Sequence, residues 1–87
     1  MIDLETYSNR INISVSEIKI KSRKRELVTA RQVYWFYLHS FGYGFSEISR
    51  MFGWDYSTII YSIQKIENLI IANDRYLKRY LEAIEYK

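Results

Sequence analysis

The residues that interrupt helices are few in this chain, and their positions constrain the fold more than any other feature. The 87 residues include no proline and only three glycines, Gly42, Gly44 and Gly53. Because glycine and proline are the strongest helix breakers, the chain divides at two places into segments of helical length. Apolar residues form 48% and charged residues 26% of the chain, a balance typical of a folded domain. We therefore predict an all-α fold of five or six helices in one domain, residues 1–87.

Apolar residues that recur three and four positions apart predict the helices in the first half of the chain. A first short helix is expected to end near residues 12–14. Ser14 and Glu17 have the spacing of a capping box, which predicts that a brief helical turn begins there. A longer helix is expected over residues 30–41, with Thr29 as its N-cap.

The second half of the chain has the sequence form of a helix-turn-helix. An eight-residue amphipathic segment, Phe45–Phe52, precedes a turn at Gly53. Asp55 is placed to cap a longer helix that extends to about residue 73. In a helix-turn-helix, the second helix enters the major groove of DNA. One more helix with an apolar edge is expected over about residues 74–86.

The outward face of the longer helix is a candidate for contact with DNA bases. Isoleucines at positions 59, 63 and 66 are expected to be buried, which turns outward the side chains of Tyr56, Ser57, Ile60, Tyr61 and Gln64. A carboxylate at the helix start can accept from a cytosine amino group, and a serine hydroxyl can bond a base edge or a phosphate. Equally open is that the hairpin is a common packing unit and that Asp55 only caps its helix.

Positive charge is concentrated in residues 19–25, which we expect to form an exposed loop. Five of the 13 Lys and Arg residues lie in this run, KIKSRKR, whereas the rest of the chain has eight cations and ten acids. A local excess of cations suits a phosphate-binding surface. Basic runs also occur as solvated surface or as localisation signals, so the charge alone leaves both interpretations open.

A basic loop, an Arg-Gln pair and an Asp-x-Ser-Thr-Ile segment follow one another in a specific order. The segments are KSRKRELVTARQ, an aromatic-rich helix, and FSEISRMFGWDYSTIIYSIQKIENL. Over about residues 13–72, this order resembles the C-terminal DNA-binding domain of the bacterial replication initiator DnaA. That family has a basic loop, a helix that starts with Arg-Gln, and a recognition helix that opens with Asp-His-(Ser/Thr)-Thr-Val. The ordered match is more specific than a helix-turn-helix alone.

The resemblance implies a DNA contact for each matching position. Arg23 lies where the family inserts an arginine into the minor groove, which suits a narrow AT-rich groove. Base contacts in the major groove are implied for Asp55, Tyr56 and Ser57. Phosphate contacts, which fix register without reading sequence, are implied for Arg31, Gln32, Thr58 and Lys65. Together with the other loop cations and one outward tyrosine, the predicted DNA-binding set is Lys21, Arg23, Lys24, Arg25, Arg31, Gln32, Asp55, Tyr56, Ser57, Thr58, Tyr61 and Lys65.

Two departures from the family pattern bear on function. Tyr56 stands where the family has histidine, and Trp54 stands, with one residue fewer, where the family has Gly-Arg. A phenol cannot reproduce the contacts of an imidazole, so we expect a sequence preference that differs from the family's origin box. The chain also has no glycine-rich phosphate loop followed by Lys-Ser/Thr, so we expect no ATPase activity.

We predict that the protein binds double-stranded DNA and acts in transcription or replication control, for example in a phage or mobile element. The sequence leaves open whether it is a regulator or a replication factor. The alternative is a protein–protein interaction module that keeps the helix-turn-helix core but has lost DNA affinity, since the chain has nine tyrosines and aromatic residues are enriched at interfaces. A homodimer through the last helix is a further expectation.

Several function classes are not expected. The chain has no cysteine and a single histidine, His39, so we predict no enzyme activity, no metal site and no cofactor. No apolar stretch approaches the roughly 18–20 residues that span a bilayer, and the first ten residues contain no cleavable apolar signal. We therefore expect a cytoplasmic, nucleoid-associated protein without membrane contact.

Overall fold

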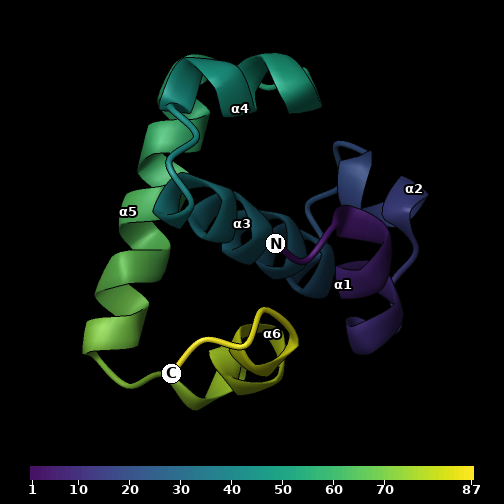
Figure 1. The fold of residues 1–87 in the computed structure, drawn as a ribbon, viewed down its shortest axis with the longest axis vertical. Helices are drawn as coiled ribbons and strands as arrows, with labels where there is room; N and C mark the ends of the chain where they lie inside the picture. The colour runs from purple at the N-terminus through teal and green to yellow at the C-terminus, as the bar shows by residue number, and fades with distance from the viewer.

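Helix α3 (Arg25–Ser40) forms the centre of the structure and packs against every other α-helix. The computed structural model describes residues 1–87 and contains no strand (Figure 1). Around α3 lie α1 (Leu4–Ile11), α2 (Val15–Lys19), α4 (Phe45–Phe52), α5 (Tyr56–Ile71), the 3₁₀ helix η1 (Arg75–Leu77) and α6 (Lys78–Ala83). In Figure 1, α5 runs along one side of α3, with α4 at one end of α5 and α6 near its other end. The predicted all-α fold is confirmed.

The aromatic-rich middle of α3 is the core of the protein. Trp35 is 1% exposed, and its ring stands edge-on to the rings of Phe52 and Trp54, with centroids 5.8 and 5.5 Å away. The buried hydroxyl of Tyr7 in α1 donates to the carbonyl oxygen of Ala30, 2.7 Å away. Aromatic residues favour strands by composition, but their spacing here places them on faces that α1, α4 and α5 cover.

The predicted helix starts at Ser14 and Asp55 are confirmed. The Ser14 hydroxyl accepts from the Glu17 backbone N–H at 3.1 Å, and the Glu17 carboxylate accepts from the Ser14 N–H at 3.2 Å. Helix α4 has the predicted bounds, and Gly53 ends it with a left-handed conformation, φ 67°. Because that conformation disfavours a residue with a Cβ, glycine suits this turn.

The predicted N-cap at Thr29 is wrong, because α3 begins one turn earlier, at Arg25. Thr29 is 8% exposed and lies inside the helix. The buried side chain of Leu27 continues the apolar face toward the N-terminus, and no glycine or proline interrupts it. As a result, the basic segment is divided: Lys19 ends α2, Arg25 opens α3, and only residues 20–24 form the loop, which we call the basic loop.

The C-terminal helix is shorter than predicted. Instead of one helix over residues 74–86, the chain forms η1 and α6, and α6 ends at Ala83. Helix α5 also ends early, at Ile71, before Asn73 adopts a left-handed conformation with φ 57°. Helix α6 is attached to α1, where the Arg79 guanidinium donates to the carbonyl oxygen of Ile11 at 2.8 Å. None of the helices has the length and apolar character needed to cross a membrane.

Candidate nucleic-acid interface

Asp55 fixes the start of α5 by capping it. Its carboxylate accepts hydrogen bonds from the Ser57 backbone N–H, at 3.1 Å, and from the Ser57 hydroxyl. The hydrogen bond from the Ser57 side chain lowers the pKa of the Asp55 carboxyl, so this exposed group is ionised at neutral pH. The negative charge lies at the positive end of the helix dipole. Asp55 therefore has a structural role as the cap, and the cap also holds the Ser57 hydroxyl at the start of α5.

The outward face of α5 is the one that the isoleucine spacing predicted. Ile59, Ile63 and Ile66 are each at most 1% exposed. On the opposite side, Tyr56 is 49% and Tyr61 62% exposed. Ser57, Gln64 and Lys65 are exposed as well, while Thr58 and Ile60 are half-buried. This face has hydroxyl, amide and ammonium groups and no carboxylate beyond Asp55 until Glu67, so it can approach an anionic duplex.

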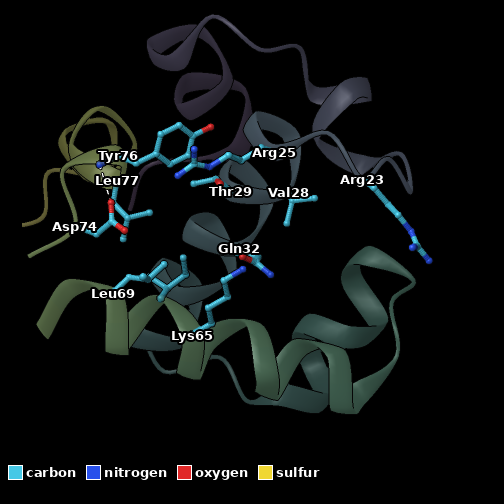
Figure 2. Close-up of a pocket in the computed structure, with 11 residues that line it drawn as sticks. Arg23, Arg25, Val28, Thr29, Gln32, Lys65, Leu69, Asp74, Tyr76 and Leu77 are labelled. Atoms are coloured by element: carbon cyan, nitrogen blue, oxygen red, sulfur yellow. Dashed lines mark hydrogen bonds between the residues drawn. The ribbon is translucent and has the colours of Figure 1, made fainter. Parts of the chain in front are cut away.

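The basic loop carries its cations outward. Lys21, Arg23 and Lys24 are exposed, and Figure 2 shows the Arg23 side chain extending outward from the loop. The loop has a local hydrogen bond, because the Lys24 backbone N–H donates to the Ser22 hydroxyl at 3.1 Å. A protruding arginine on a short loop has the reach and shape to enter a narrow groove.

Arg31 and Gln32, for which the resemblance implied phosphate contacts, lie in the interior. Arg31 is 3% exposed, and its guanidinium donates to the carbonyl oxygens of Ile20 at 2.9 Å and Ser22 at 3.0 Å. Gln32 is 8% exposed, and its amide donates to the hydroxyl of Ser62 in α5 at 3.1 Å. Both side chains use their donors within the chain, so we leave them out of the surface proposed to contact DNA. The other ten predicted residues are exposed or half-buried.

A cleft of about 370 Å³ separates α3, α5 and η1 beside this surface (Figure 2). Three cations, Arg23, Arg25 and Lys65, contribute to its lining, and Asp74 is its one acid. The Arg25 guanidinium lies over the ring of Tyr76, 3.6 Å from the ring centroid. The carboxylate of Asp74 accepts a hydrogen bond from the Tyr76 backbone N–H at 2.8 Å. The cleft therefore has a cationic rim, which suits the phosphates of a nucleic-acid backbone.

The basic loop and the start of α5 lie next to each other. The Lys21 ammonium is 5.1 Å from the centre of the Trp54 ring, and Trp54 directly precedes the capping residue Asp55. The sequence predicted two DNA-contacting elements, and the fold brings them together on one side of the molecule. Composition and spacing did not identify Trp54 or Tyr76 as partners of the cations. The one sequence feature that could have pointed to a role for Trp54 is its position directly before Asp55, where the family pattern has Gly-Arg.

The single histidine, His39, packs against other residues of the protein through a ring nitrogen and through its ring face. Nδ1 of His39 lies 2.9 Å from the carbonyl oxygen of Tyr43, and the imidazole stacks on the Phe45 ring with centroids 4.4 Å apart. The structure has no group of three or more His, Cys, Asp or Glu side chains that could hold a metal ion.

Comparisons with known proteins match this chain to a protein family and to curated relatives. The family model described as the bacterial DnaA protein helix-turn-helix matches residues 4–66. The chromosomal replication initiator protein DnaA of Kosmotoga olearia is 35% identical over 82 residues, which are 93% of this chain and 18% of that protein. The chain thus spans about a fifth of the length of this curated relative. No solved structure matches it.

Proposed function

Because the chain belongs to the family of bacterial DnaA helix-turn-helix domains, we propose that it binds double-stranded DNA through two adjoining elements. The start of α5 enters the major groove, and Arg23 of the basic loop enters the neighbouring minor groove. Family membership supports DNA binding as such. The two groove assignments rest on the exposed side chains of the loop and of the helix start.

The observation that carries this proposal is the position of the basic loop beside the capped end of α5. Lys21 contacts Trp54, one residue before Asp55, so both elements face the same side of the protein. Within residues 20–24 and 55–65 only Asp55 is acidic, and its carboxylate accepts the hydrogen bonds of the cap. Adjacent grooves of a duplex require two adjacent protruding elements, one of them narrow and cationic.

We propose that the protein occupies specific sites in cytoplasmic DNA and acts in transcription or replication by blocking or recruiting other factors. It does so without ATP hydrolysis by these residues, because no glycine-rich phosphate loop occurs in the chain. Tyr56, exposed at the helix start, gives it a base preference different from that of relatives with histidine at this position.

The experiment that tests this proposal is a fluorescence-anisotropy titration of a labelled AT-rich duplex at about 50 and 200 mM salt. The parent protein is expected to lose at least about tenfold in affinity between these conditions, since several phosphate contacts release counterions. Arg23→Ala and Lys65→Ala should each reduce the salt slope by about one. Lys87→Ala removes a cation at the C-terminus, which lies near the end of α5 opposite its capped start (Figure 1), and should match the parent.

Absent or salt-independent binding by the parent would favour the alternative, a protein–protein interaction module on a helix-turn-helix core. A homodimer through the last helix stays a prediction. Its apolar edge is largely used within the monomer, because Leu77 is 1% and Ile84 4% exposed. Gel filtration with light scattering tests it, and a monomer at high protein concentration would contradict it.

A further inference from the structure

Arg31 has no acidic partner although it is buried. The structure has a single ion pair, between Arg10 and Glu85, far from this site in sequence. Instead, the guanidinium of Arg31 donates to three carbonyl oxygens, those of Ile18, Ile20 and Ser22, at 3.4, 2.9 and 3.0 Å. Carbonyls at and beyond the C-terminal end of a helix lack helical donors and carry partial negative charge, so they suit a cation. Burial lowers the pKa of Arg31.

These carbonyls belong to the end of α2 and to the basic loop. Ser22 directly precedes Arg23, and its hydroxyl also accepts from the backbone N–H of Lys24. The backbone on both sides of Arg23 is therefore held, while the Arg23 side chain stays exposed. A single interior guanidinium on α3 thus determines where the loop lies.

The same guanidinium contacts the turn of the helix-turn-helix. It lies over the ring of Trp54, 4.4 Å from the ring centroid. Trp54 is itself held by Trp35 in the core and by Ser49, whose hydroxyl donates to the Trp54 carbonyl oxygen. The backbone N–H of Trp54 donates to the Ser49 carbonyl oxygen at 3.2 Å. The ring is therefore a fixed surface at the start of α5.

We infer that Arg31 and Trp54 are positioning residues that join the basic loop to the start of α5, and so set the spacing between the minor-groove and major-groove contacts. This inference rests on the proposed function. Arg31 holds the loop by its carbonyl oxygens and contacts Trp54 through its planar face, a combination for which guanidinium is suited and ammonium is not. Because Trp54 replaces the Gly-Arg of the family pattern, the joint is a property of this chain.

The first test needs no DNA. Trypsin cleaves after the exposed loop residues Lys21, Arg23 and Lys24 only when the backbone there opens. Trp54→Leu, which keeps an apolar side chain but removes the π face, should be cleaved several-fold faster in the loop than the parent. Trp54→Phe keeps a ring and should be cleaved at a rate near that of the parent. Equal loop cleavage for all three proteins would overturn the inference, and thermal unfolding confirms that each variant is folded.

The second test is a double-mutant cycle on a duplex that the parent selects from a random oligonucleotide pool. In the parent, Arg23→Ala should weaken binding by about tenfold. In the Trp54→Leu background the same change should cost less than about threefold, because the loop no longer presents Arg23 in register. Lys65→Ala, on α5 itself, should cost the same in both backgrounds.

The outcomes separate the two claims. If the parent binds DNA and Arg23→Ala costs the same in both backgrounds, the positioning inference alone is overturned. If the parent binds no duplex, the proposed function fails and the inference fails with it. Restoration of the tenfold Arg23 effect in Trp54→Phe would support the inference, because a merely space-filling role for residue 54 would be met by leucine as well.

Discussion

The basic loop and the start of α5 hold the side chains proposed to contact DNA in different ways. Helix α5 has a local start signal, the Asp55 cap, and its stripe of isoleucines at helical spacing is buried in the core. The loop has one internal hydrogen bond, and its carbonyl oxygens at Ile20 and Ser22 accept from Arg31, a residue of another helix. The proposed major-groove element therefore starts from a local signal, whereas the position of the proposed minor-groove element depends on contacts with another helix. Changes in the buried stripe of α5 should therefore act most strongly on stability, whereas changes at the anchor of the loop should act less on stability and also alter the position of Arg23.

The largest effect on stability is expected when an isoleucine of the buried stripe in α5 is truncated. Ile63 is 1% exposed, so Ile63→Ala should lower the free energy of unfolding by about 2–5 kcal/mol through lost burial and a cavity. Ile71, in the same helix, is 83% exposed, and Ile71→Ala should change it by less than about 0.5 kcal/mol. Urea unfolding followed by circular dichroism measures both. Equal losses would mean that the stripe does not anchor α5.

A smaller effect on stability is expected when Arg31, which holds the basic loop, is replaced. Arg31→Met fills a similar volume but leaves three carbonyl oxygens without their donor, which should lower the free energy of unfolding by about 1–3 kcal/mol. Arg23→Met, in the exposed loop, is the matched control and should have an effect below about 0.5 kcal/mol. The same urea experiment compares them. An Arg31→Met protein as stable as the control would show that Arg31 does not hold the loop.

The stability that the Asp55 cap contributes to α5 should depend on pH, which distinguishes this local signal from the contacts of the loop. The ordinary pKa of Asp55 is 3.8, and the hydrogen bonds of the cap lower it in the folded state. A lowered folded pKa contributes stability that is present above pH 3.8 and is lost as the pH falls through the folded value. Asn caps equally well but does not titrate. Thermal unfolding between pH 7 and pH 2.5 should therefore show a steeper acid loss for the parent than for Asp55→Asn.

Parallel unfolding curves for these two proteins would indicate that the Asp55 carboxylate has no special role in the folded state. Asp3 caps α1 in the same way, and hydrogen bonds from Thr6 also lower the pKa of its carboxyl. Asp3 is therefore a second titrating cap, and Asp3→Asn removes its titration. Its loss should alter the acid limb of the curve without altering DNA binding, because α1 lies outside the proposed surface.

The smallest change in stability is expected at Tyr56, where specificity should change instead. The side chain is 49% exposed, so Tyr56→His should alter the free energy of unfolding by less than about 0.5 kcal/mol. Selection from a random oligonucleotide pool should nevertheless shift toward the DnaA box, because a base-reading side chain has been replaced by that of the family. An unchanged selected sequence would contradict the assignment of Tyr56 to the major groove.

Much of the fold could be predicted because helix ends and helix faces follow from residues that are close together in the sequence. The three glycines, the capping residues and the isoleucine spacing located α4 and the outward face of α5. The start of α3 was mispredicted because Thr29 is a good N-cap by type, whereas the burial of Leu27 extends the helix by a turn. Tertiary packing decides such a boundary, and a single sequence does not display it.

The candidate site was predicted unevenly for the same reason. Exposed cations and helix-start residues follow from charge and periodicity. The position of Arg31 does not, because an arginine in a basic stretch has the same sequence signal whether it faces solvent or three carbonyl oxygens. Its burial depends on the path of residues 18–22 and on the Trp54 ring, which only the folded chain brings together.

The central claim is that one protein face reads two adjoining grooves, and a dimethyl sulfate footprint on the selected duplex tests it most directly. The reagent methylates guanine N7 in the major groove and adenine N3 in the minor groove, so one experiment reports on both. We predict protection of both kinds of atom in neighbouring base pairs, with Arg23→Ala losing only the adenine protection. Protection confined to one groove, or an Arg23→Ala footprint identical to that of the parent, would contradict the claim.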